Sequence, residues 1–133
     1  MKISSRGRYA VRIMSDIALA KDKFVSTAEI AKNQNISVKY LEQIISKLLK
    51  NKLVVSSHGA QGGYRLAKEP KDYKISEILA VTGDLPELSP CQSGALDCPI
   101  RNKCSSISMW DNLSKLIFDY LESITLEDLI NKK

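Results

Sequence analysis

The chain has little of several residue types that carry enzyme chemistry or mark a membrane protein. Its 133 residues include one histidine, one tryptophan and two phenylalanines, with six glycines and four prolines. It shows no Ser–His–Asp arrangement, no glycine-rich phosphate-binding loop and no paired carboxylates in a glycine-bounded site, so we expect no enzyme. No apolar run approaches the roughly 18 residues that a membrane-spanning helix needs, and the charged N-terminus has no signal-peptide core. We therefore expect a cytoplasmic protein that contacts no membrane.

Charge is divided unevenly along the chain. Residues 1–71 hold 14 Lys/Arg against 5 Asp/Glu, whereas residues 72–133 hold 6 against 10. Hydrophobic residues make up 44% of the sequence, which is enough for the core of one small domain. A basic half beside an acidic half indicates a polyanion-binding surface on one side of the molecule, and a solvated basic surface is the other interpretation of the same pattern.

The spacing of apolar residues predicts a mainly α fold with one small β-hairpin. The expected helices cover residues 8–20, 27–33, 38–51, 75–81 and 105–123, with a final turn to residue 130. A capping box at Ser26–Glu29 opens the second of these helices, and Ser37 caps the third. Strands at 53–57 and 63–67 flank a glycine-bearing tip. Two short helices followed directly by a hairpin form a winged helix-turn-helix.

Three segments divide the chain in this interpretation. Residues 1–83 form the winged helix-turn-helix domain, residues 84–104 a cysteine-bearing loop, and residues 105–133 a long helix with a C-terminal tail. The long helix carries apolar residues on more than one of its faces. Because so short a chain has little core left to cover such a helix, we expect a dimerisation helix that joins two copies as a homodimer.

Two parts of the expected fold carry side chains suited to double-stranded DNA. The first turns of the helix that begins near residue 38 expose polar groups that can meet base edges in the major groove, where Gln pairs with adenine and Glu accepts from cytosine. The hairpin tip suits the minor groove, and arginines of the first helix suit the phosphates. The candidate DNA-binding residues are Arg6, Arg8, Lys39, Tyr40, Glu42, Gln43, His58, Gln61 and Arg65.

The cysteines are clustered. Cys91, Cys98 and Cys104 fall within 14 residues, and in a reducing compartment such clusters bind metal or carry out redox chemistry more often than they form disulfides. Thiolates are soft ligands for zinc and for iron–sulfur clusters, but neither a zinc-ribbon nor a ferredoxin spacing is present. No neighbouring oxygen ligand stands out, so the spacing leaves an iron–sulfur cluster, a zinc ion and redox-active thiols open.

Four segments of the sequence resemble the Rrf2 family of bacterial transcription regulators. They occur in the family's order over nearly the whole chain and are Met1–Arg12, Ile36–Gln43, His58–Tyr64 and Ser123–Leu129. With three cysteines, the sequence is most similar to the IscR-type iron–sulfur cluster regulators, and the nitric-oxide sensor NsrR is a near relative. The resemblance implies a homodimeric, sequence-specific DNA-binding transcription regulator. It also implies an iron–sulfur cluster of the [2Fe–2S] type on the three cysteines, responding to iron–sulfur status, redox state or nitric oxide.

The sequence departs from the family pattern at three positions. IscR-type proteins have a histidine ligand three residues after the third cysteine, where this chain has Ile107, and NsrR-type proteins have an acidic residue where this chain has Arg8. His58 stands at a wing position where IscR-type proteins usually have arginine. The fourth cluster ligand is therefore open. The alternative expectation is a cluster-free repressor of cysteine or sulfur metabolism, similar to the regulator CymR, controlled by a partner protein or by thiol oxidation.

Overall fold

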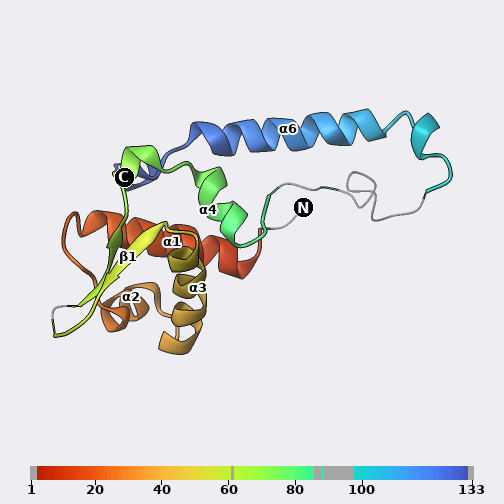
Figure 1. Cartoon of the computed structure of the whole chain (residues 1–133). Coiled ribbons are helices and arrows are strands. Elements are labelled where there is room, and N and C mark those ends of the chain that lie inside the picture. The colour runs from red at the N-terminus through yellow and green to blue at the C-terminus, as the bar shows by residue number, and fades with distance from the viewer. Residues whose placement is uncertain (1–2, 61, 86–87, 89–97, 132–133) are drawn as a thin grey trace.

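The fold is mainly helical with one two-stranded antiparallel sheet, as the sequence predicts (Figure 1). The computed structural model describes residues 3–60, 62–85, 88 and 98–131. In chain order its elements are α1 (Ser5–Leu19), α2 (Thr27–Gln34), α3 (Val38–Lys50), β1 (Val54–Ser57), β2 (Gly63–Leu66), the 3-10 turn η1 (Pro70–Asp72), α4 (Ile75–Val81), the 3-10 turn η2 (Arg101–Lys103), α6 (Ile107–Ser123) and α7 (Leu126–Ile130). Within these residues, no helix is both long and apolar enough to cross a membrane.

Serine side chains open the first three helices. Ser4, Ser26 and Ser37 each accept a hydrogen bond from the backbone N–H three residues further on, at 3.0, 3.2 and 3.1 Å respectively. Each bond pairs an N–H group that the helix itself cannot use. At the other end of α2, Asn35 adopts a left-handed conformation with φ 54°, which stops the helix and turns the chain into α3.

The core lies around α1, which contacts α2, α3, α4, α7 and β2. The apolar stripe of α1 is completely buried, as is the stripe that α3 turns toward it. The fully buried large side chains are Ile13, Met14, Ile17, Ile30, Leu41, Ile44, Ile45, Leu48, Tyr73, Ile78 and Leu126. Leu126 comes from α7, so the C-terminal tail, which the sequence-based division groups with the long helix, packs into the core of the winged domain.

A third segment pairs with the wing through its backbone, and the sequence does not reveal this pairing. β1 pairs with β2 from Val54 opposite Leu66 to Ser57 opposite Gly63. In addition, Val25 and Tyr64 exchange two backbone hydrogen bonds of 2.8 Å, so the segment between α1 and α2 borders the hairpin. Gly63 makes this approach possible, because its φ is +151° and a Cβ there would lie 2.2 Å from the Val25 carbonyl oxygen.

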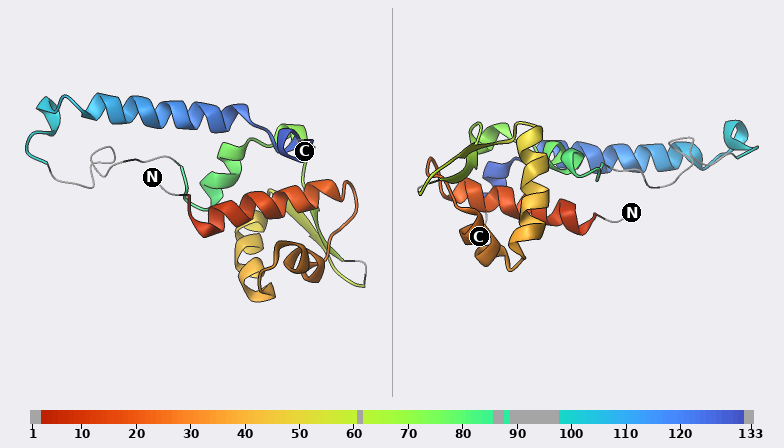
Figure 2. Two further views of the ribbon diagram at one scale, coloured as in Figure 1. Left: turned by 180° about the vertical axis from the view of Figure 1, so that it is seen from behind. Right: turned by 60° about the horizontal axis from the view of Figure 1, so that its bottom comes forward.

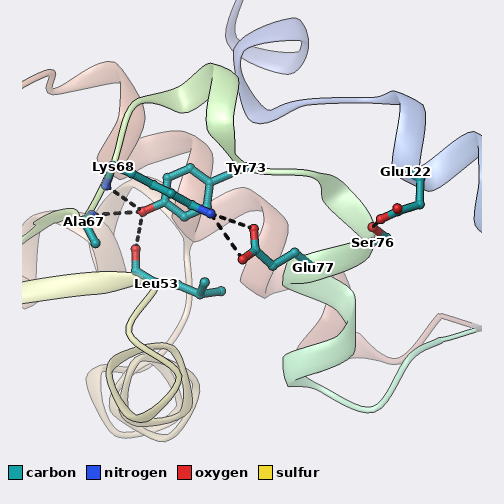
Figure 3. Close-up of polar contacts among 7 residues, drawn as sticks. All are labelled: Leu53, Ala67, Lys68, Tyr73, Ser76, Glu77 and Glu122. Carbon is teal, nitrogen blue, oxygen red and sulfur yellow. Dashed lines mark hydrogen bonds and ion pairs between the residues drawn. The ribbon is translucent and has the colours of Figure 1, made fainter.

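Helix α6 runs out past the winged domain and is anchored to it at its C-terminal end (Figures 1 and 2). The Ile75 N–H donates to the Ile124 carbonyl at 3.0 Å, and the Leu126 N–H donates to the Tyr73 carbonyl at 3.0 Å. Beside these bonds, Glu122 accepts a hydrogen bond from Ser76, as Figure 3 shows. The capping box that opens α7 at Thr125 confirms the predicted final turn.

Candidate nucleic-acid interface and cysteine pocket

Helix α3 has one buried face and one polar, exposed face. On the buried face, Leu41, Ile44, Ile45 and Leu48 are at most 1% exposed. On the other face, Lys39, Glu42 and Gln43 are exposed. Within the described parts of the chain, the side chains of these three residues form no hydrogen bond or ion pair. The first turn of α3 also contains no acidic residue, so the positive end of the helix dipole remains available to an anion. This face has the polar groups that base edges and phosphates require.

Tyr40 is half-buried and not fully exposed as the sequence suggested. Its ring meets the ring of Tyr9 edge-on, with centroids 5.7 Å apart and planes at 89°. Aromatic pairs favour this arrangement because the positive edge of one ring faces the negative face of the other. Tyr40 therefore fixes the first turn of α3 against α1. The contact joins residues 31 positions apart in the sequence, so no local pattern could reveal it.

Arg12 ties α1 to the end of α2. Its guanidinium lies 4.7 Å from the centre of the Tyr9 ring, while its Nε donates to Gln34 Oε1 at 2.7 Å and its Nη2 donates to the Gln34 carbonyl at 3.2 Å. The positive charge thus faces the negative end of the α2 dipole. Together with the tyrosine pair, this contact fixes the turn between α2 and α3 on the surface of α1.

The N-terminal turn of α1 is held by an acidic residue that directly follows the winged domain. Asp84 accepts from the Ser4 N–H at 2.9 Å, from the Ser4 hydroxyl at 2.7 Å and from the Thr82 hydroxyl at 2.5 Å. Burial by itself raises the pKa of Asp84, but these hydrogen bonds and the nearby Arg6 charge hold it below its ordinary value. Arg6 and Arg8 are both exposed near this junction. Asp84 is the first residue of the segment assigned to the cysteine loop.

The candidate residues of the wing lie in different surroundings. His58 is exposed at the tip, beside a groove of about 540 Å³ that runs between the wing and the start of α2. Arg65 is also exposed, but its guanidinium lies 4.8 Å from the centre of the Phe24 ring, at the base of the hairpin. Gln61, a further candidate, lies outside the described residues. Both residues belong to the wing, but the Arg65 side chain is placed against Phe24, whereas His58 lies at the tip.

Two of the three cysteines line one small pocket. Cys98 and Cys104 are partly buried free thiols, and they share a cavity of about 20 Å³ with Ser106, Trp110 and two neighbours. The Cys104 sulfur lies 3.1 Å from the Ser106 hydroxyl oxygen. Hydrogen bonds from the side chain and backbone of Ser106 hold the pKa of Cys104 below its ordinary value, which favours the thiolate.

The donor set of this pocket fits a soft metal centre only in part. Thiolates are the ligands that zinc and iron–sulfur clusters prefer. The described residues nevertheless contain no group of three or more His, Cys, Asp or Glu side chains placed to hold a metal ion. Cys91, the third predicted ligand, lies outside the described residues. Ile107 begins α6 beside the pocket and has no ligating atom.

Comparisons with known proteins agree on one family. Residues 3–132 match the family model of Rrf2, described as iron-dependent transcriptional regulators. The HTH-type transcriptional regulator IscR of Pectobacterium atrosepticum is 38% identical over 134 aligned positions, covering all of this chain and 81% of that protein. Among solved structures, T. potens IscR has a TM-score of 0.78 at 39% identity, covering 98% of this chain and 87% of the other. CymR (YrzC), the global cysteine regulator of B. subtilis, has a TM-score of 0.82 at 33% identity, covering 98% and 97%.

Proposed function

Because the chain belongs to the Rrf2 family and is an IscR-like DNA-binding transcriptional regulator, we propose that it binds double-stranded DNA as a homodimer and places α3 in the major groove. The exposed polar face at the start of α3 is the observation that carries this proposal. Lys39, Glu42 and Gln43 are the proposed base and phosphate contacts of α3, with Tyr40 held beside them. Arg6 and Arg8 are proposed to contact phosphates, and the wing residues His58, Gln61 and Arg65 to follow the adjacent groove.

A random duplex library tests this proposal. The dimer should enrich sequences with two-fold symmetry, because two copies of α3 would meet two half-sites about one helical turn, or a multiple of it, apart. Glu42→Ala should broaden the base preference at a defined position of each half-site. If the protein binds DNA at the chosen salt concentration but enriches no particular sequence, the proposed recognition of bases by α3 is contradicted.

The homodimer is proposed to form through α6. Of the 17 residues of this helix, only Ser114 is buried in the single chain, and large apolar side chains face solvent. Met109, Leu113, Leu116 and Tyr120 expose 52%, 40%, 67% and 63% of their surfaces. A second copy that covers this helix would remove these side chains from water. In this proposal, residues 1–83 bind DNA, residues 84–104 carry the sensing cysteines and residues 105–133 contain the dimerisation helix.

We propose Cys91, Cys98 and Cys104 as ligands of an iron–sulfur cluster of the [2Fe–2S] type. The shared pocket of Cys98 and Cys104 and the lowered Cys104 pKa support the two described ligands. Such a cluster would supply a redox-active centre whose presence depends on iron, sulfide and oxidants. The fourth ligand is unassigned, because Ile107 cannot ligate. The pocket adjoins the N-terminus of α6, so the occupancy of the site could change how the two copies are held.

The content of iron and acid-labile sulfide, measured on protein prepared without oxygen, tests the cluster. About two of each per chain would support a [2Fe–2S] centre, and about four would favour the kind of cluster expected of a nitric-oxide sensor. The absence of both from a folded dimer would support the second candidate function, in which a partner protein or thiol oxidation controls a cluster-free repressor. The similarity to CymR, whose structure covers 98% of this chain, favours that second candidate.

A further inference from the structure

One apolar side chain at the start of α3 is exposed. Val38, the first residue of the helix, is 44% exposed. Ile36 and Tyr40, two residues to either side, are both partly buried against the hydrophobic core, whereas Val38 is exposed. Valine is also a weak helix former, so it adds little stability at an exposed helical position. Val38 therefore has no evident role in holding the fold together.

The position of Val38 places it at the edge of the DNA-facing surface of α3. Val38 and Glu42 are four residues apart, so their side chains are neighbours on the same side of the helix. Lys39, next to Val38 in sequence, is exposed as well. The apolar group thus borders the polar groups proposed to meet the bases.

We propose that Val38 is a specificity-determining residue that contacts the C5-methyl group of a thymine in the major groove. This inference rests on the proposed function, in which α3 enters that groove. The thymine methyl is the apolar feature among the base edges of the major groove, so it is the group that an aliphatic side chain can recognise there. A single valine also presents much less surface than the several hundred Å² of a protein-docking patch.

The stiffness of valine suits this contact. Its branched Cβ leaves one strongly preferred χ1 rotamer in a helix, so little side-chain freedom is lost when the methyl groups meet the base. Glu42, one turn further along, accepts hydrogen bonds and favours cytosine in the same or a neighbouring base pair. Val38 would then select thymine at one base pair, and Glu42 would select cytosine at the same or an adjoining base pair.

Replacement of thymine by deoxyuracil tests the contact, because it removes only the methyl group. The duplex enriched by the wild-type dimer is remade with one deoxyuracil at a time, and its affinity is measured for wild type and for Val38→Ala. At one thymine of a half-site, wild-type binding should weaken about fourfold, which corresponds to about 0.8 kcal/mol for one buried methyl-sized group. Val38→Ala should bind the thymine and deoxyuracil duplexes equally well at that position.

Val55→Ala is the matched control. Val55 is an exposed valine that belongs to β1 and not to α3, and this variant should keep the full wild-type response to deoxyuracil. The inference would be overturned, and the proposed function left intact, if binding is sequence-specific but every deoxyuracil replacement changes the affinity of wild type and of Val38→Ala equally. Failure to enrich any sequence would instead overturn the proposed function. Circular dichroism of each variant establishes that a lost response does not come from unfolding.

Discussion

Removal of one buried hydroxyl group, by Tyr73→Phe, should destabilise the protein markedly. Tyr73 is completely buried, and its hydroxyl donates to the Leu53 carbonyl at 2.5 Å (Figure 3). The same oxygen accepts from the N–H groups of Ala67 and Lys68 at 2.9 and 3.2 Å. One side chain thereby joins the residue before β1 to the residues after β2 and fixes the base of the wing.

The magnitude follows from what each partner loses. The Leu53 carbonyl belongs to a residue that is only 4% exposed, and without the hydroxyl it keeps only a long hydrogen bond of 3.4 Å from the Ala67 N–H. Leaving a buried group without adequate hydrogen bonding costs about 1–3 kcal/mol. Ala67 and Lys68 are exposed, so water can replace the hydroxyl at their N–H groups. We expect Tyr73→Phe to lose about 2 kcal/mol in total. This loss would lower the midpoint of urea unfolding by about 1 M for a typical slope of about 2 kcal/mol per M.

Urea unfolding followed by circular dichroism, at one fixed protein concentration, measures this loss. Tyr64→Phe is the control, because the Tyr64 hydroxyl makes no hydrogen bond within the described residues, and it should change the stability little. Equal midpoints for Tyr73→Phe and Tyr64→Phe would refute the argument, since they would mean that water or the Ala67 N–H satisfies the Leu53 carbonyl after the hydroxyl is removed. An altered slope would point instead to a change in the unfolding transition.

The same tyrosine gives a dependence on alkaline pH. Burial raises the pKa of Tyr73 above its ordinary value of 10.0, against hydrogen bonds from Lys68 and Ala67 that lower it, and the charge of Glu77 raises it further. The pKa of Tyr73 is therefore higher in the folded state than in the unfolded state. The stabilisation that the protonated Tyr73 hydroxyl contributes is complete below pH 10 and is lost as the pH rises through the folded-state pKa. Phenylalanine cannot ionise, so the stability difference between wild type and Tyr73→Phe should narrow above pH 10.

Five further outcomes are expected. Glu42→Ala should relax base preference more than it weakens overall binding in fluorescence anisotropy, and an equal loss on specific and random duplexes would contradict its reading role. Arg6→Ala should weaken both duplexes alike and make the salt dependence shallower. Leu116→Asp, on the exposed face of α6, should turn the dimer into a monomer in sedimentation, unlike an exposed substitution outside α6. Asp84→Asn should lower the stability at neutral pH. Since the Asp84 pKa is lowered in the folded state, this difference should vanish as the pH falls below its ordinary value of 3.8 and through the folded-state pKa, whereas a constant difference would contradict the hydrogen-bond account. Cys104→Ser should reduce the iron and sulfide content of protein prepared without oxygen, with an unchanged circular dichroism spectrum.

Local patterns were sufficient to predict the helix-turn-helix and the wing. The apolar stripe and serine caps of α2 and α3 are separated by only a few residues in sequence, so their effects on structure appear directly in the pattern. The boundaries were less accurate. Helix α1 begins at Ser5, three residues before the predicted start, and α6 begins at Ile107, two residues after it. Helix ends depend on individual capping bonds, and Ser4 caps α1 while it is itself held by the distant Asp84.

The sequence by itself determined the family, the order of the elements and the polar character of the exposed α3 face, because these follow from spacing over one or two helical turns. Only the tertiary structure decided which candidate DNA-binding side chains pack against other parts of the protein and which remain exposed to solvent. Tyr40 packs on Tyr9, and Arg65 lies against Phe24, because segments far apart in the chain meet in the fold. The anchoring of α6 through Glu122 and Ser76 has the same origin. Such contacts have no local periodicity, since they arise from how the whole core closes and not from the preference of any one segment.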